Sequence, residues 1–156
     1  MRCPGCNRTL RRARRDYRYA ESGLPNVVLE GAPVYICTEH GVQAVALRNV
    51  LAIHDAIAGA LLELKRPLRG EEIRFLRKHR GWSQAELAER LGVTEVTVSR
   101  WETDAAPTGP ANQVALHYLF REPKKFPPRL KFIGRPPTSA PPLRIPASKS
   151  RKAATT

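Results

Sequence analysis

The chain has few cysteines, few acidic residues and no long apolar run, and each shortage excludes a class of protein. Only three cysteines occur among 156 residues, too few for the disulfide framework of a small secreted domain. The most apolar stretch, residues 42–64, is interrupted by Arg48, His54 and Asp55, which argues against a membrane span. Residues 1–20 are polar and rich in arginine, so no secretory signal is predicted. We therefore expect a cytoplasmic protein with no membrane partner.

Basic residues outnumber acidic ones by 27 to 14, which gives a formal net charge of +13. Such an excess favours a polyanionic partner, nucleic acid above all. The charge lies at the two ends of the chain: residues 1–18 carry seven arginines and one aspartate, a net charge of +6, and residues 121–156 carry +9. Residues 19–120 carry −2. The middle of the chain must therefore recognise a partner by something other than bulk charge.

Composition divides the chain into four parts and predicts an α+β fold. We expect a small zinc-binding β domain, a connecting helix, an all-α helix-turn-helix domain and a disordered basic tail, at residues 1–41, 42–66, 67–122 and 123–156. The tail prediction rests on proline, because eight of the 14 prolines follow Arg121. Proline fixes φ and lacks a backbone donor, and too few large apolar residues remain to offset the ordering entropy. The tail is either a solubilising linker or an arm that contacts DNA phosphates.

Two short motifs near the N-terminus carry metal-ligating side chains. Cys3-Pro4-Gly5-Cys6 opens the chain, and Cys37-Thr38-Glu39-His40 follows after a gap of 30 residues. Two intervening residues let both ligands of a pair reach one metal, and Gly5 is expected to supply the free backbone of the first turn. Cys3, Cys6, Cys37 and His40 would fill a structural zinc site with no open position, so we expect no enzyme. Unligated thiols, or His54 in place of His40, are the alternatives.

The residues between and after these motifs show two periodicities. Tyr17, Tyr19 and residues 27–29 and 34–36 are typical of strands, with a turn expected at Gly31-Ala32-Pro33. Hairpins would bring the two motifs together. Residues 42–65 then repeat apolar side chains at helical spacing in two rows, Leu47, Val50, Leu51, His54, Ala58, Leu61 and Leu62, and Ile53, Ile57, Leu61 and Leu64. These rows pack either within the chain or partly against a second protomer.

Residues 71–104 have the pattern of two short helices joined by a tight turn. Ser83 and Glu86 form a capping box at the start of the first helix, Gly92 ends it, and Thr94 caps the second. Ala88 is small where two helices would cross. Val98 and Trp101 would anchor the second helix to the core, in an arrangement that describes a helix-turn-helix.

Several segments here resemble a known family, the Cro/C1-type (Xre) helix-turn-helix proteins: Leu76-Arg77-Lys78, Gly81-Trp82-Ser83-Gln84, Leu91-Gly92-Val93-Thr94 and Thr97-Val98-Ser99-Arg100-Trp101-Glu102. With the two cysteine motifs, the chain also resembles the MqsA antitoxin family and its YgiT-type zinc finger, although His40 stands where that pattern has cysteine. This resemblance implies a DNA-binding homodimer that represses its own promoter and whose zinc domain binds a toxin protein. A stand-alone regulator of phage or plasmid type, a zinc-dependent hydrolase and an RNA-binding adaptor are the alternatives.

The second helix would read DNA with the face opposite Val98 and Trp101. Arg100 is the candidate for a paired contact to guanine, Val96 could pack on a thymine methyl, and Glu95 could accept a hydrogen bond from cytosine. Gln84 and Thr94 would lie near phosphates at helix N-termini, with Thr97 at the edge of the face. We therefore predict a DNA-contacting set that consists of Gln84, Thr94, Glu95, Val96, Thr97 and Arg100.

Overall fold

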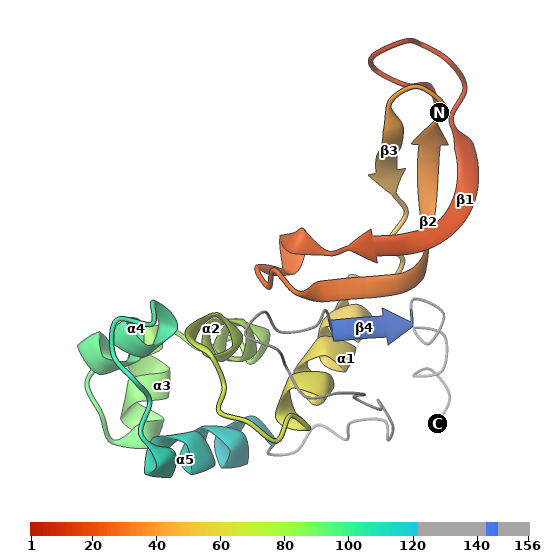
Figure 1. The fold of residues 1–156 in the computed structure, drawn as a ribbon. Coiled ribbons are helices and arrows are strands. Elements are labelled where there is room, and N and C mark those ends of the chain that lie inside the picture. Colours follow the sequence, from red (N-terminus) through yellow and green to blue (C-terminus); the bar gives the residue numbers. More distant parts are fainter. Residues whose placement is uncertain (122–142, 147–156) are drawn as a thin grey trace. The chain divides into compact units, whose positions relative to one another are not determined.

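A computed structural model describes residues 1–121 and 143–146, and these residues form two compact units (Figure 1). The first, called here the sheet unit, combines residues 1–20, 25–53 and 143–146. The second, the helical unit, contains residues 21–24 and 54–121. The α+β class expected from the sequence is confirmed. Within the described ranges, no helix has the length and apolar character needed to cross a membrane.

The sheet unit is built around one long strand, β2 (Val27–Cys37). β1 (Arg11–Arg18) pairs with β2 in antiparallel fashion along one edge. On the other edge, β3 (Gly41–Val45) pairs antiparallel with the end of β2, and β4 (Leu143–Pro146) pairs parallel with its beginning. The buried residues of β2 are Val27, Leu29, Ala32, Val34 and Cys37. Because β1 and β2 are antiparallel, the start of β1 lies beside the end of β2, where the two cysteine motifs meet.

The turn expected at Gly31-Ala32-Pro33 is a bulge inside β2 instead. Gly31 has φ +60, and the register shifts there so that Arg15 pairs with Ala32 but Tyr17 pairs with Leu29. Glycine in the left-handed region is typical of a bulge that bends a strand without ending it, and Figure 1 shows β1 and β2 strongly bent together. The chain reverses in residues 19–26 instead, which include the 3-10 helix η1 (Ala20–Ser22).

Two boundaries differ from those expected. Residues 41–45 form β3 rather than the beginning of a helix, because their backbone pairs with β2; the helix α1 spans Val50–Leu62. Its two apolar rows are not equally buried: Ile53 and Ile57 are buried, whereas Leu51 is 76% exposed.

The second difference lies in the expected disordered tail, where residues 143–146 form β4. Leu143 and Ile145 alternate with Arg144, and both apolar side chains are buried beside β2. This alternation of apolar and polar side chains supplies the half-buried strand pattern that the proline content concealed. The remainder of the tail lies outside the described residues.

The helical unit continues from α1 with α2 (Gly70–His79), α3 (Gln84–Leu91), α4 (Glu95–Glu102) and α5 (Pro110–Arg121). Its core is mostly apolar and includes the buried side chains of Ile57, Ile73, Leu76, Leu87, Val98, Trp101, Leu116 and Phe120. α2 approaches the end of α4 closely at Gly70, where a Cβ would lie 2.2 Å from the carbonyl oxygen of Trp101. The lack of a side chain at Gly70 permits this close approach.

Candidate functional site

The helices α3 and α4 are joined by a turn whose caps match the sequence prediction. The Ser83 hydroxyl accepts a hydrogen bond from the Glu86 N–H at 3.1 Å, and a Glu86 carboxylate oxygen accepts one from the Ser83 N–H at 2.6 Å. Gly92 ends α3 with φ +67, and the Thr94 hydroxyl caps α4 by accepting from the Thr97 N–H at 3.2 Å. Glycine is suited to that left-handed conformation. Each helix therefore begins and ends where its residues dictate.

The orientation of α4 is fixed from its inner face. Val98 and Trp101, one turn apart, are both buried, and Ala88 of α3 is buried as well. The opposite face carries Glu95, Val96 and Arg100, all exposed, and Val96 is 60% exposed although it is apolar. An exposed valine between two charged residues is available for contact with a ligand. These three predicted DNA contacts thus share one accessible face.

The other three predicted contacts lie at helix N-termini, and their side chains are already engaged. The hydroxyls of Thr94 and Thr97 lie 2.8 Å apart and hydrogen bond to each other. The Gln84 amide donates to a Glu102 carboxylate oxygen at 2.8 Å. Because these side chains already have hydrogen-bond partners, the groups left to contact a phosphate here are the backbone N–H groups of the helix N-termini. Gln84 and the two threonines are therefore placed to shape the site as much as to contact DNA.

A buried ion pair, which was not expected from the sequence, connects α2 to α4. Arg77 donates two hydrogen bonds to the Glu102 carboxylate, at 2.6 and 2.9 Å, and a third to the carbonyl of Trp82 at 2.8 Å. Burial by itself raises the pKa of Glu102, but the hydrogen bonds from Arg77 and Gln84 outweigh it and leave the pKa below its ordinary value. The sequence signal was the presence of charged residues on helix faces that are otherwise apolar, Glu72 and Arg77 on α2 and Glu102 on α4.

Comparison with known proteins agrees with this geometry. Residues 73–111 match the family model described as Helix-turn-helix. They form a Cro/C1-type helix-turn-helix domain. The match runs from within α2 to the beginning of α5 and so contains both helices of the motif. This is a family of DNA-binding regulators, not of enzymes. No curated protein matches the chain.

The sheet unit brings the four predicted metal ligands together. The ligand atoms of Cys3, Cys6, Cys37 and His40 all lie within 4.8 Å of one another. His40 Nδ1 is 3.6 Å from the sulfurs of both Cys3 and Cys37, and the sulfurs of Cys6 and Cys37 are 3.4 Å apart. Ligand atoms on a tetrahedral zinc are separated by roughly 3.5–3.8 Å. Three sulfurs and one imidazole nitrogen therefore fit a zinc ion and could hold one.

The backbone around the cluster favours an ionised cysteine. The backbone N–H groups of His40 and Glu39 donate to the Cys37 sulfur and, with the His40 ring, lower its pKa to about 6. A thiolate is the form that binds metal. The two motifs also share a turn: the residue after the second ligand has positive φ in each, +58 at Asn7 and +68 at Gly41.

Two expectations about this cluster are corrected or resolved. Gly5 does not adopt the left-handed conformation that would use its conformational freedom. Its role is spatial, because a Cβ there would lie 3.2 Å from atoms of the His40 ring. The choice between His40 and His54 is also settled: His40 belongs to the cluster, whereas the His54 ring packs edge-on against Phe75 in the helical unit, with centroids 5.6 Å apart.

Proposed function

We propose that this chain is a sequence-specific transcriptional repressor that binds double-stranded DNA with α4 in the major groove. The observation that carries the proposal is the exposed face of α4, where Glu95, Val96 and Arg100 stand opposite the buried Val98 and Trp101. Helix-turn-helix proteins place their second helix in the major groove in this way. Arginine with two donors facing guanine gives the commonest base-specific contact. Arg100 is therefore proposed to select the sequence.

Substitution of Arg100 tests this proposal. We expect Arg100→Ala to weaken binding to a duplex selected from a random pool by about 1–3 kcal/mol and to relax the preference at one base pair. Lys78→Ala is the matched control, because Lys78 is an exposed cation on α2, and we expect it to lower affinity equally for selected and random duplexes. Titration by fluorescence anisotropy measures both. Equal losses of affinity for both duplexes in Arg100→Ala would contradict base reading.

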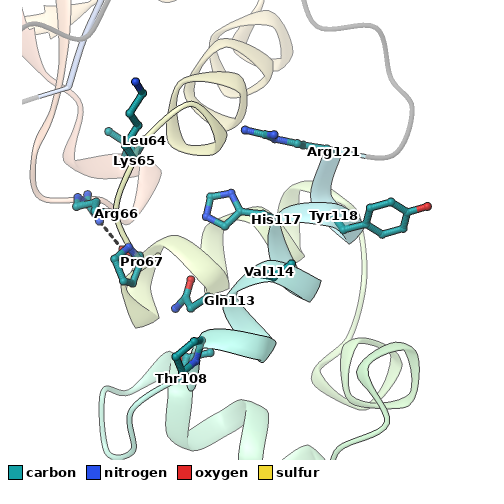
Figure 2. Close-up of a pocket in the computed structure, with 11 residues that line it drawn as sticks. Leu64, Lys65, Arg66, Pro67, Thr108, Gln113, Val114, His117, Tyr118 and Arg121 are labelled. Carbon is teal, nitrogen blue, oxygen red and sulfur yellow. Dashed lines mark hydrogen bonds between the residues drawn. The ribbon is translucent and has the colours of Figure 1, made fainter.

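We also propose that the repressor binds DNA as a homodimer through α5. Val114 and Tyr118 stand one turn apart on α5 and are 71% and 65% exposed. They lie beside a cavity of about 810 Å³, which Figure 2 shows between α5 and residues 64–67. A second copy is the occupant we favour, because an eight-residue reading helix covers only a half-site and a two-fold dimer covers a palindrome.

The oligomeric state tests the dimer. We expect the wild type to sediment as a dimer and Tyr118→Arg to sediment as a monomer with unchanged helix content. Glu89→Arg, an exposed position on α3, adds a charge of the same sign and should leave the dimer intact. A wild-type monomer at micromolar concentration, or dissociation in both variants, would remove the proposed interface.

The finer form of the proposal is an MqsA-like antitoxin that represses its own operon, with the sheet unit binding a toxin protein. A cluster of four possible metal ligands and a Cro/C1-type domain on one chain support it. The alternative is a stand-alone regulator of phage or plasmid type without a toxin partner. Expression of the adjacent reading frame decides between them: toxicity that this chain relieves supports the antitoxin, and a harmless neighbour supports the plain regulator.

A further inference from the structure

The sheet unit carries a second basic surface that the helix-turn-helix domain does not explain. Its described residues include nine arginines, three carboxylates and no lysine. Five of the arginines belong to β1, at positions 11, 12, 14, 15 and 18, and all five are exposed. Arginine is suited to phosphate because its planar guanidinium can donate two parallel hydrogen bonds, which a lysine ammonium cannot. The absence of lysine from the described sheet unit therefore points to recognition rather than to solubility alone.

The three carboxylates do not neutralise β1. Asp16 pairs with Arg144 at 2.5 Å, and Glu30 lies 3.8 Å from the same guanidinium. Glu39 pairs with Arg8 at 2.7 Å. Among the described residues, the side chains of Arg11, Arg12 and Arg15 have no hydrogen bond or ion pair, so their guanidinium groups are free to bind an external anion.

The register of β1 spreads these free groups along an accessible edge. Arg12 pairs with Tyr35, whereas Arg11 pairs with Ile36 and Arg15 with Ala32. Because side chains alternate across a strand, Arg12 points to one face of the sheet, and Arg11 and Arg15 point to the other. β1 has a paired neighbour on one side only within the described residues. On the face that they share, Arg11 and Arg15 are four residues apart, or ~13 Å of strand, which is close to four of the ~3.4 Å axial steps between phosphates along one DNA strand.

We propose that Arg11, Arg12 and Arg15 form a phosphate-binding surface for duplex DNA, which adds affinity without sequence preference. The choice of duplex DNA as the polyanion rests on the proposed function, because the same chain carries a DNA-binding domain. Charged side chains that only protect a sheet edge from aggregation can be positive or negative, and lysine is the most common of them. Three arginines without ion-pair partners among the described residues are instead typical of a surface that contacts phosphates.

The test compares the full chain with the triple variant R11Q/R12Q/R15Q on a 30-base-pair random duplex at several salt concentrations. We expect the salt slope of log affinity to fall by about 3, one unit for each phosphate that is no longer neutralised. Arg48→Gln is the matched control, because Arg48 is exposed, belongs to the sheet unit outside its strands and has no ion pair or hydrogen bond among the described residues; its slope should not change. The variant R11K/R12K/R15K should keep the slope but bind more weakly.

The outcomes separate this inference from the proposed function. A slope unchanged in the triple glutamine variant, with circular dichroism equal to that of the wild type, overturns the phosphate surface whatever Arg100 does. A reduced slope on random DNA supports the surface even if Arg100→Ala leaves sequence preference intact, in which case only base reading by α4 fails. A loss of affinity confined to double-stranded RNA of the same length, with DNA unaffected, also overturns the assignment to DNA.

Discussion

The two units of this chain are stabilised by different means. The helical unit buries a continuous apolar core and closes its helices with side-chain and glycine caps. The end of the sheet unit that holds the cysteine motifs has a core of only Cys3, Leu10 and Cys37, with Cys6 and Tyr35 packed against it. So few buried side chains cannot offset the entropy of ordering the chain. We expect a bound metal to supply that stability at this end of the sheet unit, whereas burial supplies it in the helical unit.

Removal of one metal ligand should give the largest difference in stability between the two units. We expect Cys6→Ser to release zinc and unfold residues 1–41, because a structural zinc contributes about 10–16 kcal/mol that is at the same time folding energy. The helical unit should keep its own melting transition. Calorimetry and metal analysis measure both effects. Thr38→Ala, at an exposed position within the second motif, is the control and should leave the metal content unchanged. A wild-type protein without zinc would contradict the idea that a metal stabilises this end of the sheet unit.

The buried ion pair of the helical unit should give the next largest effect. We expect Glu102→Ala to cost about 3–5 kcal/mol, because it leaves Arg77 buried without its partner. The folded pKa of Glu102 is lowered, so its contribution is present above the ordinary value of about 4.3 and is lost as the pH falls through the folded pKa. Chemical denaturation between pH 6 and 3 should therefore show a loss of stability below about pH 4 that Glu102→Gln reduces. Glu89→Ala, on the exposed side of α3, is the control and should change stability little.

A glycine substitution should give a smaller effect that is confined to the same unit. We expect Gly70→Ala to lower the stability of the helical unit by about 2–3 kcal/mol, because the added methyl group would overlap the backbone of Trp101. Gly109→Ala is the control, since a Cβ there meets nothing within 4 Å, and it should cost less than about 1 kcal/mol. Equal losses of stability would show that α2 approaches α4 less closely than this geometry requires.

The sequence predicted the helical unit better than the sheet unit, and the reason is local. The caps at Ser83 and Thr94, the left-handed Gly92 and the buried Val98 follow from side chains within a few residues of one another. The clustering of the four candidate metal ligands was also predicted, because their spacing is itself the signal. Gly31 was predicted to lie in a turn rather than in a bulge, because glycine is common in both and the neighbouring residues do not distinguish them. The Arg77–Glu102 pair and β4 depend on partners far along the chain, which no short-range pattern reports.

The parallel pairing of β4 with β2 has a consequence for the order in which the chain folds. The sheet unit draws its strands from both sides of the helical unit in the sequence, with β2 ending at Cys37 and β4 beginning at Leu143. During synthesis, all five helices emerge from the ribosome before the last strand of the sheet emerges. The helical unit can therefore begin to fold first, and the sheet is completed only when residues 143–146 emerge and Leu143 and Ile145 pair with Val27 and Leu29.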